Sequence, residues 1–255
     1  MSSDTRHGPK LTFADRVSSV RETWKATRLL SGEADWKVNI VPRISFCMSR
    51  KHNTIIAAGA KVELERLGFR QQGRSRLWLA DHQSWLNVIQ FTPDRWSKGT
   101  SLVNAVHWLW AGTGFLAFHA SVSSRSHAKF ETNEQFAGVV TDIARESANN
   151  AAELQAKFSS LERTADFAID RARSSPERMR PSWWGYQAGI ASGLIGRFDD
   201  AAFFLSGITD ERVTIHSAPL LSLTGNPDKF KSRVNELVNR QRDALHLTRL
   251  ELSPF

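Results

Sequence analysis

Two histidines, His107 and His119, have a spacing that could bring two imidazole rings together. They lie in two apolar-rich segments, residues 102–111 and 115–122, which flank Gly112-Thr113-Gly114. A three-residue turn there would make the segments antiparallel strands and would place His107 opposite His119. Facing imidazoles can share a metal ion or a proton. A metal-assisted hydrolase is therefore one hypothesis for this chain.

The same strand register predicts an apolar face on the opposite side of the two strands, with the pairs Val106/Ala120, Trp108/Phe118 and Trp110/Leu116. A third metal ligand is not evident from spacing, although Asp81, His82 or His127 would serve if the turns bring them over the histidines. The alternative is that both histidines pack beneath C-terminal helices without a metal.

A second group of residues with chemical potential is basic. Residues 1–76 hold 15 Lys and Arg against 7 Asp and Glu, whereas residues 77–255 hold 19 of each, so all of the net charge of +8 lies before residue 77. Such a surface attracts phosphates or an acidic partner. The alternative is a solvated surface that keeps the protein soluble. The candidate contact residues are Arg50, Lys51, Arg66, Arg70, Arg74 and Arg76.

A third group is the run Arg178-Met179-Arg180-Pro181-Ser182-Trp183-Trp184. Arg178 and Arg180 could hold phosphates while Trp184 stacks on a base. The alternative is a helix start with one tryptophan buried and both arginines in solvent.

Several common catalytic motifs are absent or lack their context. Gly112 to Ala117 fits a loose dinucleotide pattern, but a strand-like segment follows it instead of the required helix. The chain has no Glu-x-Lys, the pair that a nuclease of the restriction type uses, and Gly189 to Gly193 misses the nucleophile-elbow pattern by one position. The single cysteine, Cys47, excludes an intramolecular disulfide. The sequence thus favours a protein that is not an enzyme and has no cofactor.

The elements that must position these residues begin with helices. Apolar spacing predicts a helix over residues 12–30, an extended segment over 36–48, and a helix from about 54 to 67 that Asn53 caps and Gly68 ends. No run reaches the length of a membrane span, and the polar start lacks the apolar stretch of a secretory signal, so we expect a cytoplasmic protein.

Strands and then helices follow. Residues 77–79 and 85–91 predict a hairpin across residues 81–84, and the two strands that carry His107 and His119 come next. Beyond Asn133 the pattern is helical over about forty residues, with Asn149-Asn150 as a plausible interruption, so one long helix or two stacked ones both fit. Later helices are expected over 183–195, 197–205 and 227–247, the last capped by Asn226.

The segments Leu64 to Arg70, Leu77 to Leu79, Val88 to Phe91 and Leu102 to Asn104 resemble a widespread bacterial family of uncharacterised function. In that family a helix ends in a Gly-Phe-basic turn and leads into hairpins. The resemblance covers about residues 54–122 and implies an α+β fold with a helix on an antiparallel sheet, but it implies no active site.

Together these patterns predict an α+β protein with an antiparallel sheet of about four strands on a helix, followed by an all-helical C-terminal half. Residues 1–130 would form the basic helix-and-sheet module, and residues 131–255 a helical region packed on it, with one continuous domain as the alternative. The favoured function is a non-enzymatic binding or assembly protein whose basic N-terminal surface engages nucleic acid or an acidic protein. The alternatives are the His107/His119 hydrolase and a regulatory accessory subunit without a ligand of its own.

Overall fold

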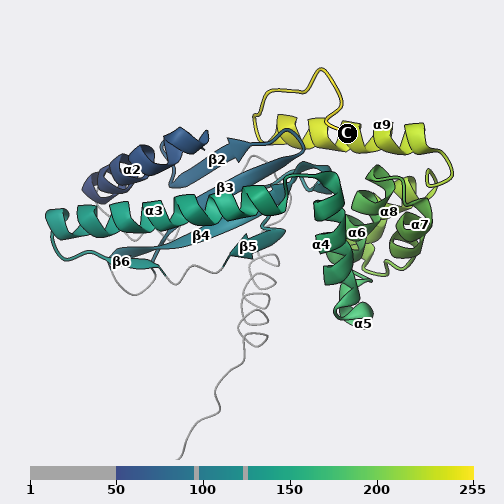
Figure 1. The fold of residues 1–255 in the computed structure, drawn as a ribbon, viewed down its shortest axis with the longest axis horizontal. Coiled ribbons are helices and arrows are strands. Elements are labelled where there is room, and N and C mark those ends of the chain that lie inside the picture. The colour runs from purple at the N-terminus through teal and green to yellow at the C-terminus, as the bar shows by residue number, and fades with distance from the viewer. Residues whose placement is uncertain (1–49, 95–97, 123–125) are drawn as a thin grey trace, which may run out of the picture. The chain divides into compact units, whose positions relative to one another are not determined.

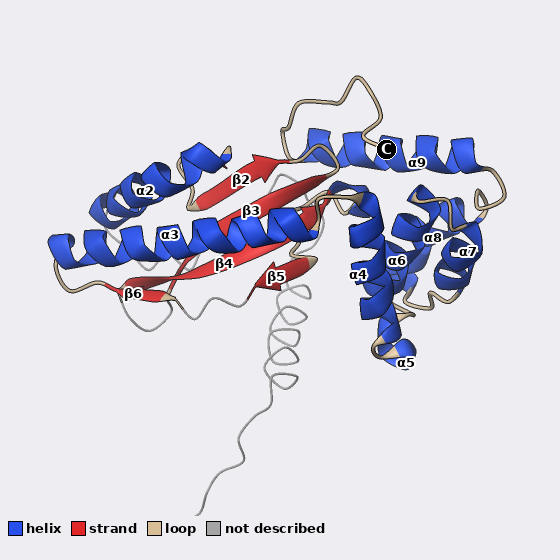
Figure 2. Cartoon of the chain, viewed as in Figure 1, coloured by secondary structure: helices blue, strands red, loops and turns tan. Residues whose placement is uncertain are grey.

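The computed structural model describes residues 50–94, 98–122 and 126–255, all within one compact unit that spans Ser45–Phe255 (Figure 1). The helix expected over 12–30, the extended segment over 36–48 and Cys47 lie outside the described residues. Within them the α+β fold is confirmed: a helix, an antiparallel sheet and then an all-helical region follow one another along the chain (Figure 2).

The sheet contains β1 (Arg70–Gln71), β2 (Leu77–Asp81), β3 (Trp85–Pro93), β4 (Gly99–Trp108), β5 (Ala120–Val122) and β6 (His127–Lys129). All pairings are antiparallel, and β1 to β5 lie in chain order. Strand β6 pairs with the first part of β4, whereas β5 pairs with its second part. The predicted hairpin of β2 and β3 is confirmed, and β1 and β6 are strands that the sequence did not predict.

Helices α2 (Arg50–Leu64) and α3 (Asn133–Lys157) cover one face of this sheet (Figure 1). The ring of His52 lies 5.8 Å from that of Phe136, and Glu63 forms an ion pair with Arg145, so the two helices run in the same direction. Buried apolar residues of both helices pack on strand residues such as Trp78. This arrangement places the starts of α2 and α3 at the same end of the sheet.

The predicted start of the first described helix was wrong. Helix α2 begins at Arg50, and Asn53 lies inside it with its side-chain oxygen accepting hydrogen bonds from Arg76 instead of capping the helix. The predicted end is confirmed: the short 3-10 helix η1 (Glu65–Leu67) follows, and Gly68 adopts φ = 81°, a left-handed conformation that glycine tolerates best.

The register predicted for the strands on either side of Gly112 is confirmed at three pairs and wrong beyond them. Val106 pairs with Ala120, but the ladder ends there, since a 3-10 helix, η2 (Leu109–Ala111), replaces the rest of the expected strand. The expected contacts of Phe118 and Leu116 across the ladder do not form, and Phe118 is 44% exposed. The loop that precedes β5 therefore leaves the sheet.

The C-terminal half consists of α4 (Leu161–Arg173), α5 (Pro176–Met179), α6 (Trp183–Leu194), α7 (Phe198–Ser206), α8 (Glu211–Leu221) and α9 (Pro227–Ala244). Helix α3 continues through Asn149-Asn150, and Ser160 caps α4 after a break at Phe158, so the helical stretch is two helices. Asn226 caps α9 as predicted, with its side-chain oxygen accepting from the backbone N–H of Lys229.

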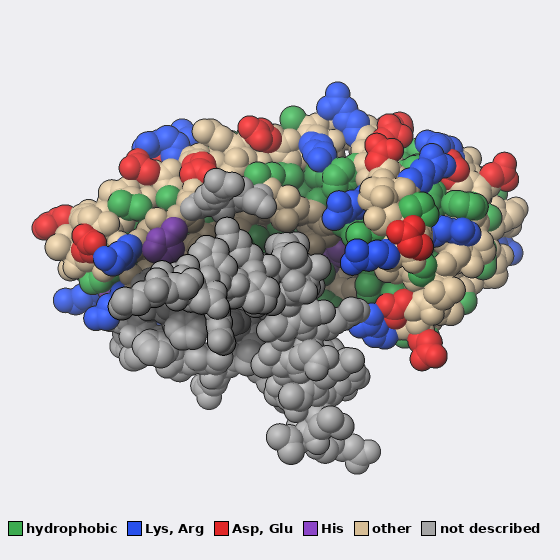
Figure 3. Space-filling view, turned by 90° about the horizontal axis from the view of Figure 1, so that it is seen from below, with side chains coloured by type: hydrophobic (Ala, Val, Ile, Leu, Met, Phe, Trp, Pro, Cys, Tyr) green, Lys and Arg blue, Asp and Glu red, His purple; other side chains and the backbone are tan. Residues whose placement is uncertain are grey.

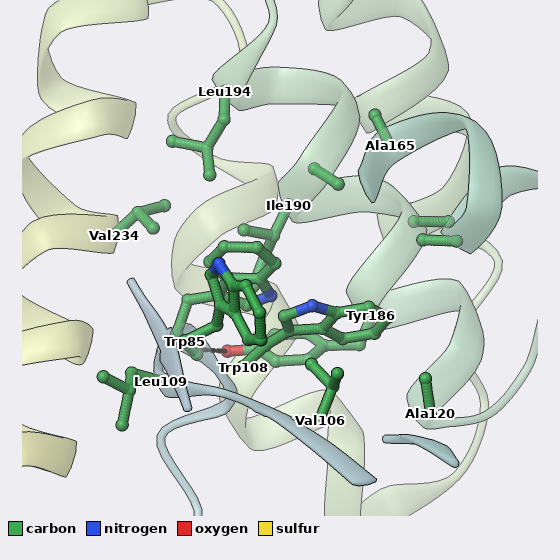
Figure 4. Packing of buried hydrophobic residues seen from close by; sticks show 14 of the residues in the cluster. Trp85, Val106, Trp108, Leu109, Ala120, Ala165, Tyr186, Ile190, Leu194 and Val234 are labelled. Carbon is green, nitrogen blue, oxygen red and sulfur yellow. Dashed lines mark hydrogen bonds between the residues drawn. The ribbon is translucent and has the colours of Figure 1, made fainter. Parts of the chain in front are cut away.

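The helical half packs on the end of the sheet through tryptophans. Figure 4 shows Trp85 and Trp108 of the strands beside Tyr186 and Ile190 of α6. Trp108 is fully buried, and burial of such a large apolar side chain stabilises the fold by about 1.5–3 kcal/mol or more. Among the described helices none is long and apolar enough to cross a membrane.

Candidate functional site

The basic residues predicted at the N-terminal surface fall along one edge of the module, formed by α2, β1 and the turn after β1. Lys51, at the start of α2, and Arg66, just beyond its end, are separated by about 22 Å at 1.5 Å per helical residue. The start of α2 is tied to the end of the β1–β2 turn, because Arg76 donates to Asn53 at 2.7 and 2.9 Å. The predicted residues therefore form a band along this edge, which we call the basic band: Lys51, Arg66, Arg70, Arg74 and Arg76. The side chain of Arg50 lies outside the description.

The members of the basic band differ in how far they are neutralised. Arg66 forms an ion pair with Glu63 at 2.6 Å, although Glu63 is shared with Arg145. Lys51, Arg70 and Arg74 are exposed and have no acidic partner within 4.0 Å among the described residues. Three solvent-facing positive charges thus remain available for a polyanion.

Burial and positive charges near the start of α2 lower the pKa of His52. Burial has the larger effect, and the nearby charges of Arg76 and Lys98 lower the pKa further. Lys98 was not among the predicted contact residues, because it lies far from the others in sequence. Its position next to α2 follows from Phe130, just after β6, which donates its N–H to the Lys98 carbonyl and packs its ring at a tilt against His52, with the ring centres 3.9 Å apart.

The second predicted group, around Trp184, is used mainly for packing. The Arg180 guanidinium lies 3.9 Å from the centre of the Phe203 ring and donates to the Phe203 carbonyl. Trp184 is half-buried and meets Trp108 edge to face at 6.2 Å. Arg178 is exposed on the short helix α5. The structure therefore places Arg180 and most of Trp184 inside the helical half and leaves Arg178 in solvent.

The two histidines do come together, although the ladder ends at Val106 and Ala120, one residue short of each of them. The rings of His107 and His119 stack with their centres 4.9 Å apart, and His119 also stacks on Trp108. His107 is fully buried and His119 is half-buried. Burial lowers the pKa of His107 to about 4 despite its hydrogen bond to Ala117, and burial lowers the pKa of His119 well below its usual value, with His107 adding to the effect. Both rings are therefore neutral near pH 7.

Hydrogen bonds determine which nitrogen of His107 carries the proton. Gln241 of α9 accepts from the Gly114 N–H with its side-chain oxygen, so its nitrogen donates to the Phe115 carbonyl and to Nε2 of His107 at 3.1 Å. Nδ1 of His107 consequently holds the proton and donates to the Ala117 carbonyl at 3.0 Å. The Ala117 N–H also lies 3.1 Å from Nδ1. If Nδ1 accepted a hydrogen bond from it, the proton of His107 would lie on Nε2 and would face the side-chain NH2 of Gln241, which is also a donor.

The proton on His119 is determined in the same way. Its Nδ1 accepts the Trp108 backbone N–H at 2.9 Å, which leaves the proton on Nε2. Each ring therefore uses its lone pair on a protein donor, and a metal would have to displace one of these hydrogen bonds. The described residues contain no group of three or more His, Cys, Asp and Glu that could hold a metal ion. The geometry supports a structural role for the pair.

The loose dinucleotide pattern is a loop. Gly112 and Gly114 have φ of 64° and 76°. A loop and then strand β5 follow Gly114 directly, so this motif has no helix N-terminus for a pyrophosphate. Gly189 to Gly193 lies within α6, away from any strand-to-helix turn. The first motif is thus a turn and the second is part of a packed helix, and neither has the geometry of the site that its sequence resembles.

No family model matches this chain, and the searches of curated proteins and of solved structures also find no match.

Proposed function

We propose that this protein is a non-enzymatic nucleic-acid-binding protein that contacts phosphates through the basic band. The observation that carries the proposal is the set of three exposed cations, Lys51, Arg70 and Arg74, without acidic partners among the described residues. A band of about 22 Å matches about six nucleotides of one strand at 3.4 Å per nucleotide. The lone pairs of His107 and His119 are both engaged by protein donors, which supports the non-enzymatic part of the proposal.

Salt dependence and a double variant test this proposal. Labelled single- and double-stranded DNA and RNA should bind the full chain at about 50 mM salt. With one phosphate on each of the three exposed cations, affinity should fall about 20- to 40-fold by about 200 mM, because binding to phosphates releases counterions. Arg70→Ala/Arg74→Ala should weaken binding to every sequence and reduce the slope of log affinity against log salt by about 1 for each lost phosphate contact.

The control removes the same charge elsewhere. Lys229 and Arg240 are exposed on α9, outside the basic band, so Lys229→Ala/Arg240→Ala changes net charge equally and should leave affinity close to that of the wild type. Equal losses in the two double variants would show that net charge alone drives binding. No binding at the lower salt would contradict the proposal and would point to an acidic protein as the partner of the band.

A further inference from the structure

A hollow of about 260 Å³ lies between the loop that follows η2 and the first turns of α6. Phe115, Phe118 and His119 line it from the loop, and Trp183, Trp184 and Gln187 line it from the helix. Small-molecule sites in proteins range from about 300 to 1,000 Å³, so this hollow is suited to one ring with a short substituent.

Two of the aromatic side chains at this hollow are unusually exposed. Phe115 is 59% exposed and Phe118 is 44% exposed, and they belong to the small set of large apolar side chains that the described part of the chain leaves in solvent. Clustered apolar exposure next to a hollow is typical of a binding site. An apolar or aromatic ligand would remove both rings from water.

Gln187 supplies a hydrogen-bond donor without a partner. Its side-chain oxygen accepts the Trp110 indole N–H at 2.6 Å, which fixes the orientation of the amide. Gln187 is only 1% exposed, so its Nε2 is shielded from solvent. This Nε2 also has no hydrogen-bond partner among the described residues. A buried donor without an acceptor is unfavourable, and the acceptor of a bound ligand would satisfy it.

His119 supplies a second donor of the same kind. Because its Nδ1 accepts the Trp108 N–H, its Nε2 carries a proton and is free to donate. None of the described residues at the hollow carries a charged side chain, so nothing there would compensate an ionised ligand group. Two neutral donors beside aromatic rings are best matched by an uncharged acceptor.

We propose that this hollow binds a small, uncharged, planar ring that carries a carbonyl group. The ring packs on the aromatic side chains, and the carbonyl oxygen accepts from Nε2 of Gln187 or of His119. This site is separate from the basic band, and its test does not depend on nucleic-acid binding.

Benzamide is the probe, and benzylamine is its matched control. Both contain a phenyl ring, but benzamide carries a neutral carbonyl group, whereas benzylamine carries a cationic amine. Each is titrated into the full chain while the indole N–H signals are followed by NMR, with Trp183→Phe and Trp184→Phe assigning the relevant peaks. We expect benzamide to shift those peaks saturably and to bind at least about tenfold more tightly than benzylamine, which corresponds to about 1.4 kcal/mol.

Protein variants locate the site. Phe118→Ala should weaken benzamide binding several-fold, whereas Phe203→Ala, which removes a ring that is 48% exposed and does not line the hollow, should not. Gln187→Glu keeps an oxygen for Trp110 but replaces the amide donor with a carboxyl group that can pair with the cation of benzylamine, so it should reduce the preference for benzamide over benzylamine. Absence of a saturable shift, or equal effects of Phe118→Ala and Phe203→Ala, would overturn the proposal.

Discussion

At the scale of single residues, the decisive features are hydrogen bonds made by side chains distant in sequence. His107 and His119 look like a metal or proton pair by residue type, but Gln241 and the Trp108 backbone occupy their lone pairs. Residue type and spacing predicted that the rings would meet. They could not predict the partner on α9, because that contact depends on how the helical half packs.

An ion pair between a buried arginine and a carboxylate that is 39% exposed connects the sheet to α9. Arg242 of α9 has a side chain that is 3% exposed, and it donates to both carboxylate oxygens of Asp81 at 2.9 and 2.6 Å, as well as to the Gln83 carbonyl. Loss of one partner leaves a buried charge without its counter-charge. Arg242 would keep the Gln83 and Thr248 carbonyls as acceptors, so Asp81→Ala should lower the free energy of unfolding by about 1–3 kcal/mol.

Urea unfolding measures this effect, and an exposed ion pair provides the comparison. Arg233 and Glu236 form a salt bridge at 2.7 Å on the surface of α9, with the Glu236 side chain 58% exposed. Glu236→Ala should cost less than about 1 kcal/mol because solvent screens the pair. Similar losses of unfolding free energy in the two variants would show that the Asp81–Arg242 pair stabilises the fold no more than an exposed ion pair does.

At the scale of elements, α6 is held in place by close helix packing. A Cβ added at Gly189 would lie 2.6 Å from Cγ of Leu205 in α7, too close for either helix to accept without moving. Helix propensity favours alanine over glycine by about 0.5–1 kcal/mol, whereas overpacking costs about 1–3 kcal/mol. Since the packing cost is larger, Gly189→Ala should destabilise the protein.

The matched substitution is Gly138→Ala in α3. A Cβ at Gly138 meets nothing within 4 Å, so the propensity gain remains and the variant should be more stable by about 0.5–1 kcal/mol. Thermal unfolding measures both variants: the melting temperature should fall for Gly189→Ala and rise for Gly138→Ala. A stabilised Gly189→Ala variant would mean that α6 and α7 can separate at little cost.

Element order was largely predictable, because apolar alternation and caps are local signals. The β2–β3 hairpin, the end of the α2–η1 helical stretch at Gly68 and the cap of α9 at Asn226 all follow from them. The loop after Trp108 was not predictable. There, His119 accepts the Trp108 N–H and Gln241 binds Gly114 and Phe115, so distant side chains replace the hydrogen bonds of the expected ladder.

At the scale of the whole molecule, the excess positive charge lies in residues 1–76, and residues 50–76, which include the basic band, hold 7 Lys and Arg against 2 Asp and Glu. Residues 77–255 carry as many acidic as basic side chains, and in Figure 3 basic and acidic side chains intermix over the helical half at the right. This balance makes a general attraction of the helical half for polyanions weak. Specific binding to the basic band is therefore separable from net charge by the two double variants described above.

The buried histidines predict how stability changes with pH. Burial is the largest cause that lowers the pKa of each of five described histidines: His52, His82, His107, His119 and His216. Because a histidine in the unfolded chain has a pKa near 6.5, the unfolded state takes up protons first as the pH falls. These groups therefore stabilise the fold fully above about pH 6.5, and the stabilisation is lost as the pH drops toward the folded-state values, about 4 for His107.

The expected free energy of unfolding thus decreases between pH 6.5 and 5, a range in which most carboxylates remain ionised. His107 alone contributes a slope of up to about 1.4 kcal/mol per pH unit there. His107→Gln should be less stable than the wild type at pH 7.5 but should show a shallower slope, since one titrating group is gone. Urea titrations at pH 7.5, 6.5, 5.8 and 5 measure both quantities, with those pH values chosen to bracket the ordinary histidine pKa of about 6.5. Parallel curves for the two proteins would contradict a buried, neutral His107, because only a histidine that titrates equally in the folded and unfolded chain leaves the slope unchanged.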